Sequence, residues 1–157
     1  MIIGLFSILA LLGIFTAYSE RGNPIVEANV EGTETQIARG QTIALWSCAG
    51  CHSLDKELPL SGGENTLADV PMPLGQATPP NLTPGGRIDE WTDGQLQRAI
   101  REGTSPSGHL MPLMAINTFR YLSQPDLDAI VAYLRSQPTV ESEANQENPF
   151  LSSLRGC

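Results

Sequence analysis

Cys48-Ala49-Gly50-Cys51-His52 is the stretch of this chain from which the rest is best interpreted. Two thiols separated by two residues and followed at once by an imidazole form the attachment motif of a c-type haem. Thioether bonds from both cysteines would hold the porphyrin edge, and His52 would be the first axial ligand of the iron. We therefore predict one haem c, covalently bound through Cys48 and Cys51.

Two other interpretations of the motif are weaker. A redox-active pair of the thioredoxin type occurs near a βαβ pattern, which this sequence does not show, and it has no use for the histidine. A structural zinc site needs four ligands, and outside the motif the chain offers only His109 and Cys157. Cys157 has no evident partner within the chain, and we interpret it as a spare terminal residue.

The first 18 residues carry no charge and consist mainly of Ile, Leu, Phe, Ala and Gly. As a helix they would span roughly 27 Å at about 1.5 Å per residue, close to the ~30 Å hydrocarbon core of a bilayer. We predict a single transmembrane anchor over residues 1–19, in contact with lipid through residues 1–18. The alternative is a signal peptide, because Ala17-Tyr18-Ser19 fits a small-x-small cleavage site, although no basic residue precedes the apolar run.

Haem attachment also predicts where the protein resides. Covalent attachment takes place on the outer side of the energy-transducing membrane, so the residues after the anchor must be exported. We expect a bacterial cytoplasmic membrane, with the haem domain on the periplasmic side.

The chain is acidic, with 17 Asp and Glu against 9 Lys and Arg and a net charge of −8 at pH 7. Such a surface argues against a nucleic-acid partner, whose phosphates recruit Lys and Arg. It favours a protein partner with a basic docking face, although solubility alone would also explain it.

Helical signals dominate after a polar linker over residues 20–32. Thr33-x-x-Gln36 resembles a capping box and predicts a helix that runs from Thr33 into the haem motif. Residues 53–90 are rich in proline and glycine and predict a long irregular loop, for which wrapping an apolar cofactor supplies a reason.

The second half of the chain continues this all-α pattern. Thr92-Asp93-Gly94-Gln95 predicts a short helix that Gly103 ends, and residues 104–121 form another connection. Ser123 begins a last helix that stops before Pro138. This last helix places four apolar residues on one side: Leu127, Ile130, Val131 and Leu134. Residues 139–157 show little periodicity and predict a tail that extends over a partner or stays mobile.

Residues 33–138 resemble a class I monohaem cytochrome c domain, because helix, Cys-x-x-Cys-His, long loop, short helix, methionine loop and last helix follow in that family's order. The chain is similar in particular to cytochrome c domains of bacterial membrane-bound dehydrogenase subunits and respiratory assemblies. The segments that carry this similarity are Pro80-Asn81-Leu82-Thr83-Pro84, Trp91-Thr92-Asp93, Arg98-x-x-Arg101-Glu102-Gly103, Leu110-Met111-Pro112-x-Met114, Phe119-Arg120-x-Leu122-Ser123 and Ala132-Tyr133-Leu134-Arg135. The resemblance implies an all-α class I cytochrome c fold around one haem.

The resemblance also implies the second axial ligand. In the family pattern the axial methionine stands eight residues before the leucine that precedes the last helix, and counting back from Leu122 gives Met114. Met111 and His109 remain alternatives, because Ala115 departs from the proline that usually follows the ligand. A methionine ligand would raise the reduction potential relative to a second histidine.

Residues around the haem follow by the same resemblance. The carbonyl of Pro80 would accept a hydrogen bond from the ring of His52, and the propionates would be contacted by Asn81, Thr83 and Arg87.

Two further residues are interpreted as structural. Gly40 matches the family glycine that lets the first helix approach the last one, opposite Tyr133 or Ile130. Trp91 would anchor its helix.

The resemblance implies a one-electron carrier and no catalytic residue, with redox partners in a membrane electron-transport complex. A dehydrogenase, a quinol-oxidising complex, a terminal oxidase and a reaction centre are all compatible with the sequence. Two other classes stay open: a peroxidase-like or gas-reducing haem enzyme, which needs an open iron position, and a structural subunit with a vestigial haem.

Overall fold

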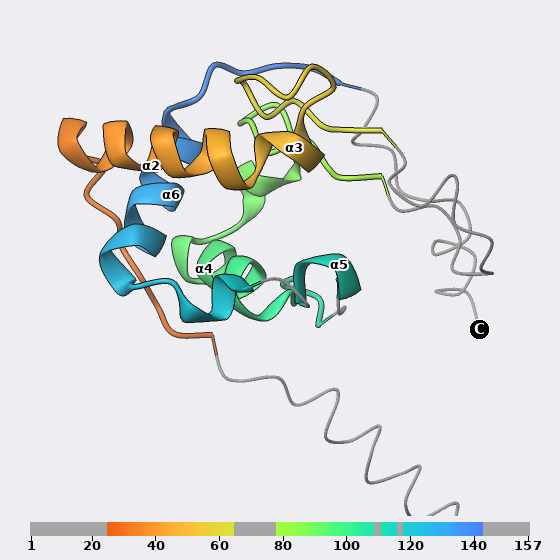
Figure 1. The fold of residues 1–157 in the computed structure, drawn as a ribbon. Helices are drawn as coiled ribbons and strands as arrows, with labels where there is room; N and C mark the ends of the chain where they lie inside the picture. The colour runs from red at the N-terminus through yellow and green to blue at the C-terminus, as the bar shows by residue number, and fades with distance from the viewer. Residues whose placement is uncertain (1–24, 65–77, 109–110, 116–117, 143–157) are drawn as a thin grey trace, which may run out of the picture.

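The computed structural model describes residues 25–64, 78–108, 111–115 and 118–142. Its helices, in chain order, are α2 (Glu34–Ser47), α3 (Ala49–His52), α4 (Asp93–Glu102), α5 (Pro112–Ala115) and α6 (Gln124–Ser136), with the 3-10 turns η1 (Arg87–Glu90) and η2 (Thr118–Tyr121). The prediction of an all-α fold is confirmed for these residues, among which there is no β-strand (Figure 1).

Side-chain caps begin the three longest helices at the predicted residues. Thr33 begins α2 with a capping box that includes Gln36, and Thr92 begins α4 in the same way with Gln95. The hydroxyl of Ser123 accepts a backbone N–H of the first turn of α6. Each cap satisfies N–H groups that a helix start leaves unpaired, so the chain enters each helix at a defined residue.

The helix ends also follow the sequence. Gly103 adopts the left-handed conformation, with φ 63°, and its N–H donates to the Ala99 carbonyl at the end of α4. This conformation is readily available only to glycine. α6 ends at Ser136, and Gln137 is its extended C-cap before Pro138.

α2 and α6 pack directly against each other at Gly40. A Cβ atom at Gly40 would lie 1.9 Å from the carbonyl oxygen of Ala129 and 2.8 Å from Cβ of Tyr133. The predicted close approach is therefore confirmed, with the Ala129 backbone and Tyr133, rather than Ile130, as the nearest neighbours. No residue larger than glycine fits between these two helices without moving them apart.

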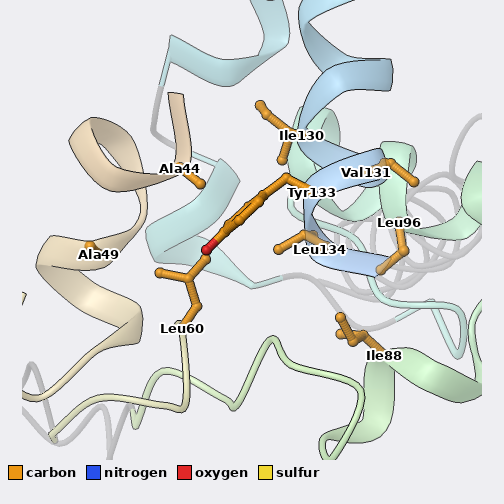
Figure 2. Close-up of a cluster of buried hydrophobic side chains, with 9 residues drawn as sticks. All are labelled: Ala44, Ala49, Leu60, Ile88, Leu96, Ile130, Val131, Tyr133 and Leu134. Carbon is orange, nitrogen blue, oxygen red and sulfur yellow. The ribbon is translucent and has the colours of Figure 1, made fainter. Parts of the chain in front are cut away.

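The hydrophobic core lies where α6 meets α2, α4 and the loop after α3 (Figure 2). Its buried side chains are Ala44, Ala49, Leu60, Ile88, Leu96, Ile130, Val131, Tyr133 and Leu134. In Figure 2 the ring of Tyr133 extends from α6 toward Leu60. The four predicted core positions of α6 are buried, and so are Ala129, Ala132 and Tyr133, because α6 has neighbours on several sides.

The two long connections contain short elements that the sequence did not predict. η1 lies within residues 53–90, and α5 and η2 lie within residues 104–121. Each has four residues, which is too short for hydrophobic periodicity to indicate a helix. Residues after the last helix also contact the domain, because the Val140 carbonyl accepts a hydrogen bond from Asn81 Nδ2 at 2.6 Å.

Within the described part of the chain, no helix has the length and apolar character needed to cross a membrane. The predicted anchor over residues 1–19 lies outside the described residues. The same holds for His109, Cys157 and residues 143–157 of the predicted tail.

Candidate functional site

The two cysteines and the histidine of the motif come from one short helical turn. Cys48 follows α2 directly, and its N–H donates to the Ala44 carbonyl, so α2 leads almost without interruption into α3 (Figure 1). The N–H of His52 donates to the Cys48 carbonyl at 2.8 Å. Neither Cys48 nor Cys51 forms a disulfide. Two thiols and one imidazole thus come from five consecutive residues of helical backbone.

The environment of Cys48 does not favour a redox-active thiol. Burial, together with the smaller effect of the neighbouring Cys51, raises the pKa of this thiol to about 11. Reactive cysteines of oxidoreductases have lowered pKa values, because the thiolate is the nucleophile. At neutral pH Cys48 is therefore a protonated thiol, which is unlike the active-site cysteine of a thioredoxin.

His52 is buried, with 7% of its surface exposed, and its Nδ1 lies 2.9 Å from the carbonyl oxygen of Pro80. A carbonyl oxygen can only accept a hydrogen bond, so Nδ1 carries the proton and Nε2 keeps its lone pair. Burial lowers the pKa of the ring, and the bond to Pro80 opposes this effect. The contact that the resemblance implies between these two residues is present. Burial favours the neutral imidazole, and the contact through Nδ1 leaves Nε2 as the nitrogen that could bind iron.

The loop after α3 closes against the motif through two glycines. The N–H of Gly62 donates to the His52 carbonyl at 2.9 Å. A Cβ atom at Gly63 would lie 1.8 Å from the carbonyl oxygen of Cys51 and 3.4 Å from Cγ of Pro79. Sequence reasoning missed the importance of Gly63, although the Gly62-Gly63 pair shortly after the motif was the signal that could have indicated it.

Asn81 and Thr83 are buried, at 1% and 0% exposure, and they bind groups within the chain. Oδ1 of Asn81 accepts from the N–H and the hydroxyl of Thr83, at 2.8 and 2.7 Å. Nδ2 of Asn81 donates to the Val140 carbonyl, and the Val140 N–H donates to the Thr83 hydroxyl. In the structure these side chains fix the loop that carries Pro80. Their contact with propionates, and that of the exposed Arg87, stays a prediction.

The candidate methionines belong to a separate part of the fold, at α5. The N–H of Met111 donates to the Gly103 carbonyl, and the N–H of Met114 donates to the Met111 carbonyl at 2.9 Å. A Cβ atom at Gly103 would lie 2.5 Å from the backbone nitrogen of Ala115, so α5 packs directly on the end of α4. Both methionine side chains are half-buried. In Figure 1, α3 lies above α5 in the view.

The donor set agrees with a covalently attached haem. Over residues 25–64, 78–108, 111–115 and 118–142, no three side chains of His, Cys, Asp or Glu gather in a way that could hold a metal ion directly. What the chain offers is a buried imidazole with a fixed ring, two thiols on the same helical turn, and a thioether on α5, in a separate part of the fold. These residues fit the needs of a haem c, which takes two thioether bonds and one imidazole from such a motif.

Residues 37–138 match the sequence profile of the family described as cytochrome c. The chain belongs to the cytochrome c family. Its helical fold is accordingly a cytochrome c fold, and membership implies a covalently bound haem c. A cytochrome c of this kind is an electron carrier.

Three relatives extend this assignment. One of the subunits of nicotinate dehydrogenase from Pseudomonas putida is 36% identical over 114 residues, which are 69% of this chain and 9% of the relative. A diheme cytochrome c-type protein of Cereibacter sphaeroides is 28% identical over 146 residues, 87% of this chain and 47% of the relative. The fructose dehydrogenase cytochrome subunit of Gluconobacter japonicus is 29% identical over 147 residues, 90% of this chain and 30% of the relative. This cytochrome c therefore spans less than half the length of each of them, and it is related to cytochrome subunits of dehydrogenases.

Proposed function

We propose that this cytochrome c carries one electron at a time through a single haem, attached at Cys48 and Cys51, with His52 and Met114 as the iron ligands. When bound, the haem iron supplies the chemistry by gaining and losing one electron. The observation that carries the proposal is the buried His52, whose Nδ1–H is donated to the Pro80 carbonyl. A ring held in this way presents Nε2 in one orientation in both oxidation states, so little has to rearrange when the electron moves.

A single haem agrees with two observations. The sequence contains one Cys-x-x-Cys-His motif. In addition, the match to the diheme relative covers 47% of that protein, which is the share expected of one haem-binding unit out of two. We therefore propose one haem per chain.

The proposed electron donor is a dehydrogenase, because two of the relatives carry names of dehydrogenase subunits. The surface beside the motif suits a protein partner. Trp46, two residues before Cys48, is 83% exposed, and Leu54, two residues after His52, is 70% exposed. Large apolar side chains in such positions supply contact area for a partner close to the attachment site.

Residues 1–19 are proposed as a membrane anchor that holds the haem domain on the outer side of a bacterial cytoplasmic membrane. The support for this proposal is the uncharged apolar run at the start of the sequence. Cell fractionation tests it: the full chain should sediment with membranes and need detergent for release, and added protease should reach the haem domain in spheroplasts. A soluble protein that lacks residues 1–19 would contradict the anchor and leave the haem assignment intact.

Spectroscopy of the purified holoprotein tests the ligands. The ferric protein should be low-spin with a weak near-infrared band from sulfur to iron, and the ferrous protein should not bind carbon monoxide rapidly. Met114→Leu should abolish the band and allow carbon monoxide to bind, whereas the matched control Met111→Leu should leave both properties unchanged. A high-spin spectrum of the unmodified protein would favour the haem enzyme, and loss of the band in Met111→Leu alone would reassign the ligand.

A second variant separates the carrier from a structural subunit. Met114→His keeps two axial ligands but lowers the reduction potential of the iron. In the parent complex it should reduce turnover while the complex still assembles. Unchanged turnover would favour the structural subunit, in which electron transfer does not pass through this haem.

A further inference from the structure

The segment that carries Pro80 is paired with the loop after α3. The N–H of Leu82 donates to the Leu60 carbonyl at 2.8 Å, and the N–H of Gly63 donates to the Pro79 carbonyl at 3.1 Å. Because one residue number rises as the other falls, residues 60–63 and 79–82 run antiparallel. Pro80 lies between these two hydrogen bonds, so their register determines where its carbonyl oxygen stands.

The side chain of Gln137 closes one end of this pair. Its Oε1 accepts the N–H of Leu60 at 2.8 Å, and its Nε2 donates to the Leu82 carbonyl at 2.8 Å. Both partners are backbone groups with fixed donor and acceptor character, so the orientation of the amide is determined by its contacts. Gln137 is 5% exposed, and its buried amide supplies one acceptor and one donor to the two paired backbone segments.

The residues after Gln137 support the same segment from a second point. The Val140 carbonyl accepts from Asn81 Nδ2, and the Val140 N–H donates to the Thr83 hydroxyl. A Cβ atom at Gly85 would lie 2.3 Å from the Val140 carbonyl oxygen, so the two backbones are in close contact there. Residues 137–140, which we call the clamp segment, thus hold the chain immediately after Pro80 at Leu82 and Asn81.

We propose that Gln137 is a positioning residue for the proximal iron ligand: by fixing the register of residues 60–63 and 79–82, it holds the Pro80 carbonyl in reach of His52 Nδ1–H. This inference rests on the proposed role of His52 as an iron ligand. A carbonyl that accepts a hydrogen bond from Nδ1–H makes the imidazole a stronger electron donor to the iron. This favours ferric iron and lowers the reduction potential. Gln137 therefore influences the potential through the backbone of Leu60 and Leu82, the partners of its side-chain amide.

Gln137→Leu removes both hydrogen bonds and keeps a side chain of similar size. In the holoprotein we expect the reduction potential to rise, and the Nδ1–H of His52 to exchange with solvent about tenfold faster, because a lost buried hydrogen bond opens the segment more often. The potential is measured by redox titration, and the exchange by NMR of the hyperfine-shifted ring proton. The near-infrared band of the methionine ligand should persist.

Gln97 supplies the matched control. It is also buried, at 9% exposure, but it lies on α4, where its Nε2 donates to Asp128 at 2.8 Å and its Oε1 accepts from Gln124. Gln97→Leu should lower the melting temperature and leave both the potential and the exchange rate of the His52 proton unchanged. If Gln137→Leu behaves like Gln97→Leu, Gln137 is only a structural residue and the proposal is overturned.

A second variant keeps the proposal testable if the first variant does not acquire haem. If Gln137→Leu does not retain haem, the same two measurements are made on Gln137→Glu, which keeps an acceptor for Leu60 and loses the donor for Leu82. An unchanged potential and exchange rate in that variant would also overturn the proposal. Failure of the proposed function is distinguishable, because it would show in the unmodified protein as a His52 ring without hyperfine-shifted signals.

Discussion

The histidine side of the site, residues 48–52, 60–63, 79–83 and 137–140, is held by hydrogen bonds between segments far apart in the sequence, such as the bond from Leu60 to Gln137. The methionine side, residues 103 and 111–115, is held by contacts with the end of the adjacent α4, chiefly at Gly103. The chain therefore builds His52, the first proposed ligand, into a network of buried polar groups and places Met114, the second proposed ligand, on a single short helix. Changes on the histidine side should affect haem retention and potential, whereas changes on the methionine side should open the iron to external ligands.

Gly63→Ala is expected to have the largest effect, because the new Cβ would meet the Cys51 carbonyl oxygen at 1.8 Å, and a backbone atom at the attachment site cannot move away cheaply. Overpacking of this severity should lower the free energy of unfolding by about 3 kcal/mol or more. Haem content and thermal unfolding of the purified protein measure the effect. Gly50→Ala, inside the motif but with nothing within 4 Å of its Cβ position, is the control and should retain haem. Equal behaviour of the two variants would contradict the close approach at Gly63.

Gly103→Ala should have the next largest effect, and it tests the methionine side. Its φ of 63° costs an alanine roughly 1–2 kcal/mol, and the Cβ would also press on Ala115. We expect the near-infrared band to disappear at a lower temperature than in the unmodified protein, before the helices unfold. Gly108→Ala has a φ of 84° without any neighbour within 4 Å, so it reproduces the backbone strain alone. If both variants lose the band at the same temperature, contact between α4 and α5 does not position the methionine.

Asn81→Ala should have a moderate effect and act on the histidine side only. It removes two buried hydrogen bonds with Thr83 and one partly buried hydrogen bond, which leaves the Val140 carbonyl without one donor. A loss of about 1–3 kcal/mol in the free energy of unfolding is expected. Denaturant unfolding of the ferric protein measures it, and the iron–sulfur band should persist up to the main transition. Early loss of that band would show that the two sides are coupled.

Asp126→Asn should have the smallest effect, because Asp126 belongs to neither side. Its hydrogen bond with Arg39, followed by that with Ser123, holds the pKa of its carboxyl below the usual range. The carboxylate therefore adds stability at pH values above the unfolded-state pKa, about 3.9, and this contribution is lost as the pH falls through the lower folded-state pKa. In thermal unfolding from pH 7 to pH 2, the difference in melting temperature between the unmodified protein and the variant should disappear at the acidic end. A constant difference would contradict the lowered pKa.

Local signals in the sequence were sufficient to predict where the helices of the fold begin and end. The caps at Thr33, Thr92 and Ser123 and the left-handed Gly103 are each determined by residues within one helical turn, so a short pattern predicts them. The contact between His52 and Pro80, 28 residues apart, was accessible only through the resemblance to the family.

Long-range polar contacts could not be predicted in the same way. Gln137 reaches Leu60 across 77 residues, and nothing in its neighbourhood distinguishes it from an ordinary residue at the end of a helix. Gly63 contacts the Cys51 carbonyl only because the intervening loop turns back on α3. Such partners depend on how segments meet in space, which composition and periodicity do not encode.

The place of the clamp segment at the end of the domain has a consequence for the order of events in the cell. A polypeptide is synthesised from its amino end, so Cys48 and Cys51 are made before Gln137 and Val140. The two cysteines can thus encounter a porphyrin before residues 137–140 are present to hold the Pro80 segment against His52. If Gln137 positions Pro80 as proposed, the support of His52 is complete only after residues 137–140 have been made.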